Sequence, residues 1–339
     1  MSKLSRRDFL KVIAAGASGA LLSGCGQPAP APTAAPPTRT PLPPPTLVPP
    51  SATPLPTVVP TAAPTATPKP IPELVVARGE NPEEMIRQAM KAMGGMEKFV
   101  KKGAEVIIKP NMCVGYRSYE YAATTNPWLV GGIVKLCLEA GAKRVRVMDF
   151  PFDGTQQQAY TQSGVEKEVK AAGGQMEYMA AFKYTKVKLQ NALELKESEI
   201  YDDFLKPDNV IINVPIAKHH AAARLTLGMK NFMGVIVDRD VLHHNLGQRI
   251  ADLNTKIRPT LTVMDGIRIL MARGPQGGSL NDVKKINTIA VSQDVVAVDS
   301  YATQWFNLKP DDIAYITAGA KMGLGRSDWK SLRIEEINV

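Results

Sequence analysis

The sequence has few of the residues that disulfide scaffolds and metal centres use most. Only three of its 339 residues are cysteine, and only four are histidine. Cys113 and Cys137 could form one disulfide outside the cytoplasm, but two cysteines do not make a disulfide framework. Cys137 lies in the apolar run 133–138. We therefore expect both to be structural or free thiols, since cysteine is among the most buried residue types.

Several catalytic and binding motifs are also absent from the sequence. It has no G-x-S-x-G, which argues against a Ser-His-Asp hydrolase, and no G-x-G-x-x-G, which argues against nicotinamide dinucleotides. It has no H-E-x-x-H zinc motif. Residues 273–278 (Arg-Gly-Pro-Gln-Gly-Gly) are rich in glycine but match neither phosphate-binding fingerprint. They are expected to form a turn.

The positive charge of the chain is concentrated at its start. The formal net charge is +9, of which residues 1–24 carry +3 and residues 25–72 carry +2. Residues 73–339 therefore keep +4. This modest excess suits a small anionic ligand, and no basic stripe with interleaved aromatic residues indicates nucleic acid.

The first 24 residues have the features of an export signal. Residues 5–11 (Ser-Arg-Arg-Asp-Phe-Leu-Lys) match the twin-arginine consensus, with Arg6 and Arg7 as the arginine pair, and a short apolar run follows at 12–22. Residues 22–25 (Leu-Ser-Gly-Cys) form a lipobox, in which Cys25 would be acylated. The alternative is an amphipathic helix with an incidental cysteine.

This order of signals predicts a place in the cell. We expect export by the Tat translocase, processing by the lipoprotein machinery, and a lipid anchor on the outer side of the cytoplasmic membrane, either periplasmic or at the cell surface. Residues 25–72 hold 18 of the 27 prolines and are rich in Thr and Ala. We expect them to be a disordered, extended tether, reaching up to about 140 Å at about 3.1 Å per residue.

Residues 73–339 are expected to fold as an α/β unit. Apolar strands at 74–77, 104–109, 144–149, 209–214, 260–265 and 286–292 alternate with helices predicted at 81–100, 126–140, 156–172, 225–232, 245–257, 295–306 and 311–322. Such alternation predicts a mostly parallel sheet with helices on both faces. It would form one large domain or two closely joined lobes.

Polar residues gather where the predicted strands stop. Lys109 and Asn111, Asp149, Lys218 with His220, and Asp265 each follow an apolar run. In parallel sheets ligands bind beyond the carboxyl ends of the strands. A shared pocket is therefore expected there, although each residue taken alone would more often be a solvated loop residue.

All four histidines occur as adjacent pairs, 219–220 and 243–244. Neighbours in an extended segment point oppositely, so at most one of each pair should face a common site. One histidine from each pair, together with Asp265, could bind a divalent metal, or one could act as a general acid or base. The alternative is that all four are surface or capping residues.

These motifs, in this order, resemble those of the DUF362 domain family. They read Ile-Lys-Pro-Asn at 108–111, Thr-Thr-Asn-Pro at 124–127, Asn213 through His220, Lys-Asn-x-x-Gly at 230–234, Asp265-Gly266, Gly-Pro-x-Gly at 274–277, and Ala-Val-Asp at 297–299. Within the first histidine pair, the resemblance selects His220. Some family members carry ferredoxin-like modules, but this chain has no C-x-x-C-x-x-C run, so an iron–sulfur cluster is not expected.

Our leading hypothesis is an enzyme for a small carboxylate or phosphate, in which a divalent metal could assist. His220, Lys218 and Lys230 would be catalytic, and His220, His243 and Asp265 would hold the metal. The residues expected to bind the ligand are Lys109, Asn111, Thr125, Asn126 and Asn231. The rival hypothesis is a non-catalytic lipoprotein that captures an anionic solute. An extracytoplasmic redox partner would need a cluster or haem, for which the sequence offers no ligands.

Overall fold

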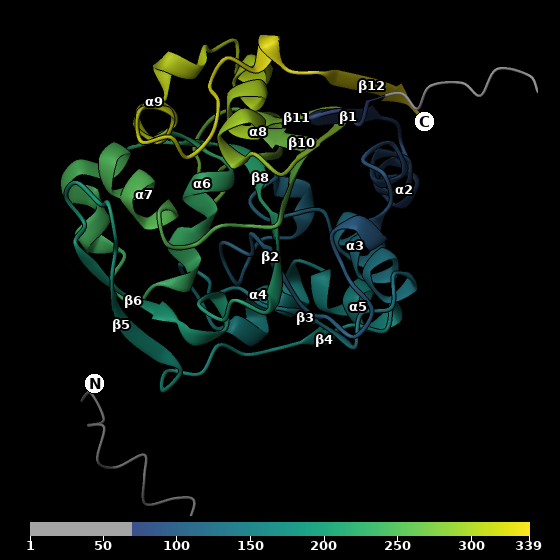
Figure 1. The fold of residues 1–339 in the computed structure, drawn as a ribbon, viewed down its shortest axis with the longest axis horizontal. Coiled ribbons are helices and arrows are strands. Elements are labelled where there is room, and N and C mark those ends of the chain that lie inside the picture. Colours follow the sequence, from purple (N-terminus) through teal and green to yellow (C-terminus); the bar gives the residue numbers. More distant parts are fainter. Residues whose placement is uncertain (1–69) are drawn as a thin grey trace, which may run out of the picture. The chain divides into compact units, whose positions relative to one another are not determined.

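The computed structural model describes residues 70–339, in which one large sheet organises the chain (Figure 1). The predicted signal at 1–24 and almost all of the predicted tether lie outside the described residues. The sheet runs in the order β12-β1-β11-β10-β7-β2-β3-β4, and β8 and β9 extend it beside β10. The strand bounds are β1 Leu74–Arg78, β2 Glu105–Pro110, β3 Arg144–Val147, β4 Gln175–Met176, β7 Asn209–Val214, β8 Ile216–His220, β9 Arg224–Thr226, β10 Leu261–Leu270, β11 Val283–Ser292 and β12 Ile334–Asn338.

Most strand pairs in this sheet are parallel. Strands β4, β3, β2, β7 and β10 form a continuous parallel series, and β8 and β12 also pair in parallel with β10 and β1. Strand β11 lies antiparallel between β1 and β10, and β9 is antiparallel to β8. A separate hairpin joins β5 (Tyr184–Lys188) to β6 (Glu197–Tyr201). The mostly parallel sheet confirms the predicted fold class.

Helices cover both faces of the sheet, as predicted. The helices α2 (Pro82–Ala92), α3 (Pro127–Glu139), α4 (Gln156–Gln162) and α5 (Val165–Ala171) bury one face, with alternate strand residues such as Val106 and Ile108. The other face packs against α6 (Gly228–Asn231), α7 (Leu246–Asn254), α8 (Val295–Ala302) and α9 (Ala314–Lys321). This division follows from the two-residue period of strands, which sends neighbouring side chains to opposite faces.

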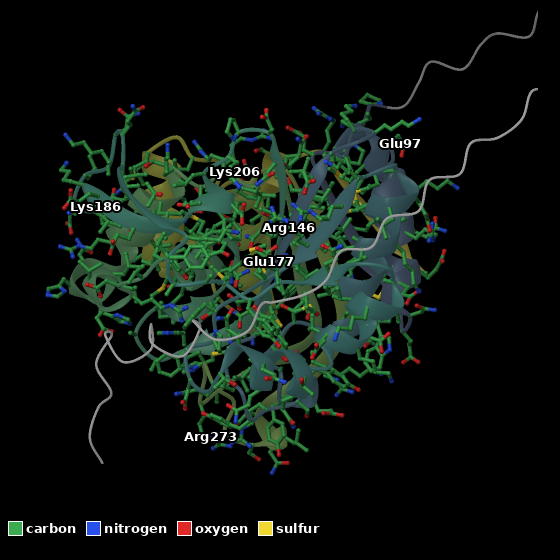
Figure 2. All side chains as sticks on the ribbon, turned by 90° about the horizontal axis from the view of Figure 1, so that it is seen from below. Glu97, Arg146, Glu177, Lys186, Lys206 and Arg273 are labelled. Carbon is green, nitrogen blue, oxygen red and sulfur yellow. The ribbon has the colours of Figure 1, made fainter. Side chains whose placement is uncertain are left out.

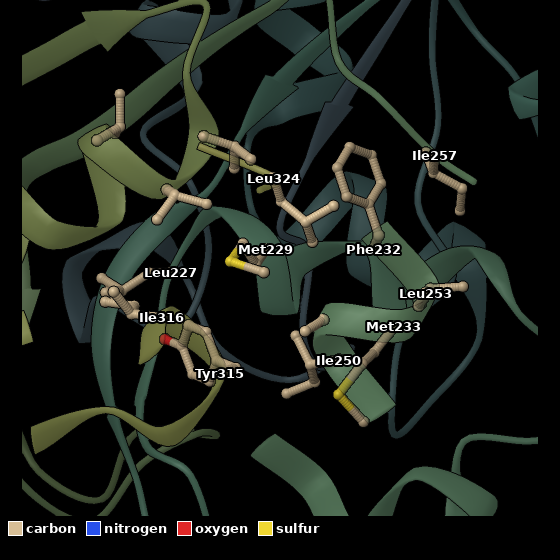
Figure 3. Packing of buried hydrophobic residues seen from close by; sticks show 14 of the residues in the cluster. Leu227, Met229, Phe232, Met233, Ile250, Leu253, Ile257, Tyr315, Ile316 and Leu324 are labelled. Atoms are coloured by element: carbon tan, nitrogen blue, oxygen red, sulfur yellow. The ribbon is translucent and has the colours of Figure 1, made fainter. Parts of the chain in front are cut away.

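Figure 3 shows part of the second cluster at close range. Met229 and Phe232 lie beside Ile250 and Leu253 of α7 and near Tyr315 of α9. The short α6 turn is therefore buried on its apolar side. This packing matters for the site, because the same turn carries Lys230 and Asn231.

The structure departs from the predicted helices most clearly at three places. Helix α2 ends at Ala92, where Gly94 and Gly95 follow with positive φ. The helix predicted over 156–172 is divided at Gly164, whose φ of 79° is a left-handed conformation. The prediction of one helix over 225–232 is wrong: the first residues of this segment belong to strand β9, which pairs with β8, and only α6 is α-helical.

A buried ionic cluster ties the hairpin to the sheet (Figure 2 labels Arg146, Glu177 and Lys206). Asp203, which is 1% exposed, lies 3.0 Å from Arg146 Nη1, 2.7 Å from Lys183 Nζ and 2.6 Å from Lys206 Nζ. Burial opposes ionisation, but these three donors together hold the pKa of Asp203 below its usual range. The carboxylate therefore compensates two largely enclosed cations at once.

Replacing Asp203→Asn is expected to lower the free energy of unfolding by about 1–3 kcal/mol, because Arg146 and Lys183 lose one of their two carboxylate partners and keep only Glu177. Denaturant titration of the full chain measures this change. Lys206→Met is the matched control. It removes the partner whose side chain is 57% exposed, and it should cost less than about 1 kcal/mol. Equal effects of the two substitutions on the free energy of unfolding would contradict the role of Asp203 as a buried counter-charge.

Candidate functional site

The polar strand ends surround a cavity of about 290 Å³. Its walls come from the end of β2, the loop after β3, the β8–β9 hairpin, the α6 turn and the segment 239–243. Lys218 of β8 lies opposite Thr226 of β9, and His220 is two residues further along β8. These three side chains therefore share one face of the hairpin, and all three line the cavity.

Lys109 is the most completely enclosed cation of this cavity. Its Nζ lies 2.7 Å from Asp149 Oδ1 and donates hydrogen bonds to Pro110 O at 3.0 Å and to Asn231 Oδ1 at 3.1 Å. Burial lowers the pKa of Lys109, and the attraction of Asp149 opposes that shift. Lys109 is thus fully compensated within the protein.

A row of asparagines extends this network. Asn231 Oδ1 also accepts from Asn111 Nδ2 at 2.9 Å, and Asn231 Nδ2 donates to Asn213 Oδ1 at 2.8 Å and to Lys109 O at 3.1 Å. The amide orientations are fixed because each oxygen must face donors and each nitrogen must face acceptors. The network joins β2, β7 and α6 into one rigid wall.

Lys218 is fully buried but has good acceptors. Its Nζ donates to Ala123 O at 2.7 Å and to Asn111 Oδ1 at 2.9 Å. Burial lowers the pKa of Lys218, whereas its interaction with Cys113 raises it. Because both acceptors are neutral, the Lys218 ammonium has hydrogen bonds but no full counter-charge.

Lys230 differs from both of these lysines. It is 7% exposed, and the hydrogen bond found for its Nζ is to the weak acceptor Met233 Sδ, at 3.2 Å. Among residues 70–339 its ammonium forms no ion pair within 4.0 Å. Burial, and then repulsion from Lys218, lower the pKa of Lys230 to about 7. This group can therefore gain or lose a proton near neutral pH.

His220 is held as a neutral hydrogen-bond donor. Its Nδ1 accepts from the backbone N–H groups of Ala222 and Ala223, both at 3.1 Å, so the ring hydrogen lies on Nε2. Burial, and then the charges of Lys230 and Lys218, lower the pKa of His220 to about 3. This arrangement does not favour the proton-transfer or metal-binding roles expected from the sequence, because the free polar group is an N–H.

The three predicted metal ligands do not come together. His220 and His243 both line the cavity, and Nδ1 of His243 donates to Arg239 O at 3.2 Å. Asp265 is buried elsewhere, where its carboxylate accepts from the backbone N–H of Asn126 at 2.7 Å and of Ile267 at 2.9 Å. Burial raises the pKa of Asp265 to about 7. Across residues 70–339, no group of three or more His, Cys, Asp or Glu is placed to hold a metal.

Thr125 and Asn126, expected to bind the ligand, brace the backbone instead. Thr125 Oγ1 accepts from the N–H of Asn111 and donates to Val214 O, both at 2.8 Å. Asn126 Oδ1 caps α3 by accepting from Trp128 N at 3.1 Å and Leu129 N at 3.2 Å. Neither residue lines the cavity that holds Lys230.

Two further motif residues fix the α6 turn. Asp299 accepts from the N–H groups of Gly228 at 2.6 Å and Met229 at 2.9 Å, and burial raises the pKa of Asp299 to about 8. At Gly234, an added Cβ would lie 2.4 Å from Asp149 Oδ1. Only glycine therefore lets this backbone approach the Lys109–Asp149 pair.

Sequence reasoning missed several residues that line the cavity. Cys113 lies two positions after Asn111, and Thr226 lies in a segment wrongly predicted as helix. Arg239 donates from Nη2 to Phe150 O at 2.8 Å and stacks on the Phe150 ring at 5.3 Å. Only the position of Cys113 beside the Lys-Pro-Asn strand end could have signalled its role, because the other contacts join distant segments.

The arrangement provides donors and positive charge at close range. Lys218, Lys230, His220 and Arg239 line the cavity, while Asp149 is paired with Lys109. The buried groups without a strong partner, Lys230 Nζ and Thr226 Oγ1, are donors that match the oxygens of a carboxylate or a phosphate. The exposed carboxylate of Asp240 also lines the cavity. Phe150, Phe152 and Met233 add apolar surface to the wall.

This chain is similar in sequence to a cyanobacterial protein and more distantly similar to solved structures. The thylakoid-associated protein sll1697 of Synechocystis is 26% identical over 253 residues, covering 70% of this chain and 74% of its own length. The lactate racemase apoprotein of Thermoanaerobacterium thermosaccharolyticum is 12% identical with a TM-score of 0.42. A Thermotoga maritima protein is 12% identical with a TM-score of 0.38. The alignments cover 71% and 73% of this chain, but only 58% and 60% of those two structures.

The family comparison confirms the resemblance noted in the sequence. The family model described as "Domain of unknown function (DUF362)" matches residues 106–304, which extend from within β2 into η7 (Thr303–Phe306) and include all the cavity residues named above. The matched span also contains the bracing residues Thr125, Asp265 and Asp299. This chain therefore belongs to the DUF362 domain family.

Proposed function

We propose that this protein binds a small carboxylate or phosphate in the cavity beside Lys230 and acts on it as an enzyme. The observation that carries the proposal is a buried lysine without a carboxylate partner, in a cavity that Lys218 and Arg239 also line. Buried cations are normally compensated, and an anionic ligand would supply the missing charge.

The other polar residues would then orient the ligand. Lys109 and Asn231 are held in a fixed network, so they form a wall that does not need to rearrange on binding. His220 offers its Nε2–H, and Lys218 adds positive charge. No metal is required by this arrangement, because Lys230 and Lys218 provide the positive charge.

We further propose that the domain works outside the cytoplasm, held to the membrane through Cys25. The twin-arginine motif and the lipobox support this placement. The Synechocystis relative is named a thylakoid-associated protein. Within residues 70–339 no helix is long and apolar enough to cross a bilayer.

Calorimetry on the full chain tests the binding proposal. Acetate, sulfate and inorganic phosphate are the probes, and a matched uncharged compound such as acetamide is the control. Turnover of phosphate monoesters and carboxylate esters separates the enzyme from a solute-binding lipoprotein, which would bind without turnover. Absence of binding by every anion would exclude the pocket.

The affinity for sulfate, whose charge is constant between pH 6 and 9, should fall about tenfold for each pH unit above pH 7. Lys230 has a pKa of about 7 in the free protein, so rising pH removes the proton that the anion needs. Calorimetry across this range measures the slope. The Lys230→Arg variant stays charged across this range, so its affinity for sulfate should change little with pH. An unchanged slope in that variant would assign the titration to another group.

Lys230→Met should raise the midpoint of thermal unfolding and reduce anion affinity at least tenfold at pH 6. Removing a buried charge without a counter-charge stabilises the fold, while the ligand loses its main partner. Differential scanning calorimetry and binding titration measure the two effects. Lys218→Met is the contrast, because it leaves Ala123 O and Asn111 Oδ1 without their donor and should destabilise the fold. A destabilised Lys230→Met protein would indicate a structural role.

Cys25→Ser should move the protein from the membrane fraction to the soluble fraction of the exporting cell, because the serine cannot be acylated. Fractionation followed by immunoblotting measures the distribution. Replacing both Arg6 and Arg7 by Lys should instead retain the chain in the cytoplasm. Unchanged membrane association of Cys25→Ser would contradict the proposed anchor.

A further inference from the structure

The two cysteines of the described domain lie in different surroundings. Cys113 is 9% exposed and lines the cavity, whereas Cys137 is fully buried in helix α3. Burial raises the pKa of the Cys137 thiol far above its usual range. Both thiols are free. Only Cys113 is therefore placed to meet a molecule that enters the cavity.

Cys113 shares its cavity with two lysines. Lys218 and Lys230 line the same cavity, and the interaction with Cys113 raises the pKa of each lysine against the effect of burial. Such surroundings attract anionic reagents and compensate a thiolate, which is the nucleophilic form of cysteine.

A second, independent feature points to a ligand in the same cavity. Thr226 is 4% exposed, lines the cavity, and its Oγ1 has no hydrogen-bond partner within the described structure. A buried hydroxyl without a partner is costly unless something fills the site. The Nε2–H of His220 is a neighbouring donor on the same hairpin. Together they suit an oxygen that gains negative charge during a reaction.

We propose that Cys113 is the nucleophile of this cavity and forms a covalent bond with a carbon electrophile that carries a carboxylate or phosphate group. The inference rests on the proposed anion site, which would hold the charged group while the sulfur reaches the carbon. The substrate class is then an anionic ester or thioester.

The chemistry balances without an oxidant or a metal. The thiol proton passes to solvent, and the sulfur attacks the carbonyl carbon to form a thioester. The bond from that carbon to the leaving oxygen or sulfur breaks, and the Lys230 ammonium, which holds the anionic substrate, donates its proton to the leaving group. Water then loses a proton to Lys230 and hydrolyses the thioester, and the sulfur takes a proton from solvent to restore the thiol.

Alkylation of the full chain by an anionic and a neutral reagent tests the proposal. Iodoacetate and iodoacetamide are supplied separately, and labelling of each cysteine is followed by peptide mass spectrometry. The sulfur displaces iodide from either reagent, so the two differ only in charge. The rate ratio of iodoacetate to iodoacetamide is calibrated on a small neutral thiol, and Cys137 is the internal buried reference.

At Cys113 the ratio should exceed the calibration value by about tenfold or more, because the cavity concentrates anions. The ratio should fall severalfold in Lys230→Met, and Cys137 should stay unlabelled. Sulfate should protect Cys113. Cys113→Ser should bind sulfate normally but lose any ester turnover found for the native chain.

Two outcomes would overturn the proposal. The first is that Cys113 is alkylated as slowly as Cys137. The second is that the iodoacetate-to-iodoacetamide rate ratio at Cys113 equals that of the small thiol. If sulfate binds while either of these results is found, the anion site stands and the nucleophile is excluded. If sulfate also fails to bind, the proposed function fails with it.

Discussion

The buried pair of Lys109 and Asp149 is the interaction on which the rest of the site depends. Two opposite charges 2.7 Å apart inside the protein need further hydrogen bonds, and Asn231, Pro110 O and the N–H of Met112 provide them. These groups come from β2, the loop after β3 and the α6 turn. The positions of all three segments are therefore fixed by one electrostatic requirement.

This requirement also restricts the neighbouring backbone. Gly234 passes so close to the pair that no side chain fits, and Asp299 holds the first N–H groups of the same turn. Lys230 lies in that turn, next to Asn231. The turn thus presents one lysine that the protein leaves without a counter-charge, at a cost in stability that is typical of functional sites.

The motifs shared with the DUF362 family divide into two kinds of residue. Lys109, Lys218, His220 and Lys230 line the cavity, whereas Thr125, Asn126, Asp265 and Asp299 bind backbone groups around it. The second kind is buried and satisfied, so its polarity serves structure. A polar residue at a strand end can therefore belong to the site without meeting the ligand.

Local sequence patterns were enough to predict the fold class and the edge of the sheet at which the cavity lies. Continuous apolar strands and the helix caps Asn81 and Asn126 are local features, and local chemistry dictates them. The sequence did not determine which side chains face the cavity. Cys113 and Thr226 enter it, and Asp265 turns away, because of how β8, β9 and α6 pack against distant strands. Partners and burial are set by contacts between distant segments, so only the tertiary structure decided that Lys230 would lack a counter-charge and that His220 would be a neutral donor.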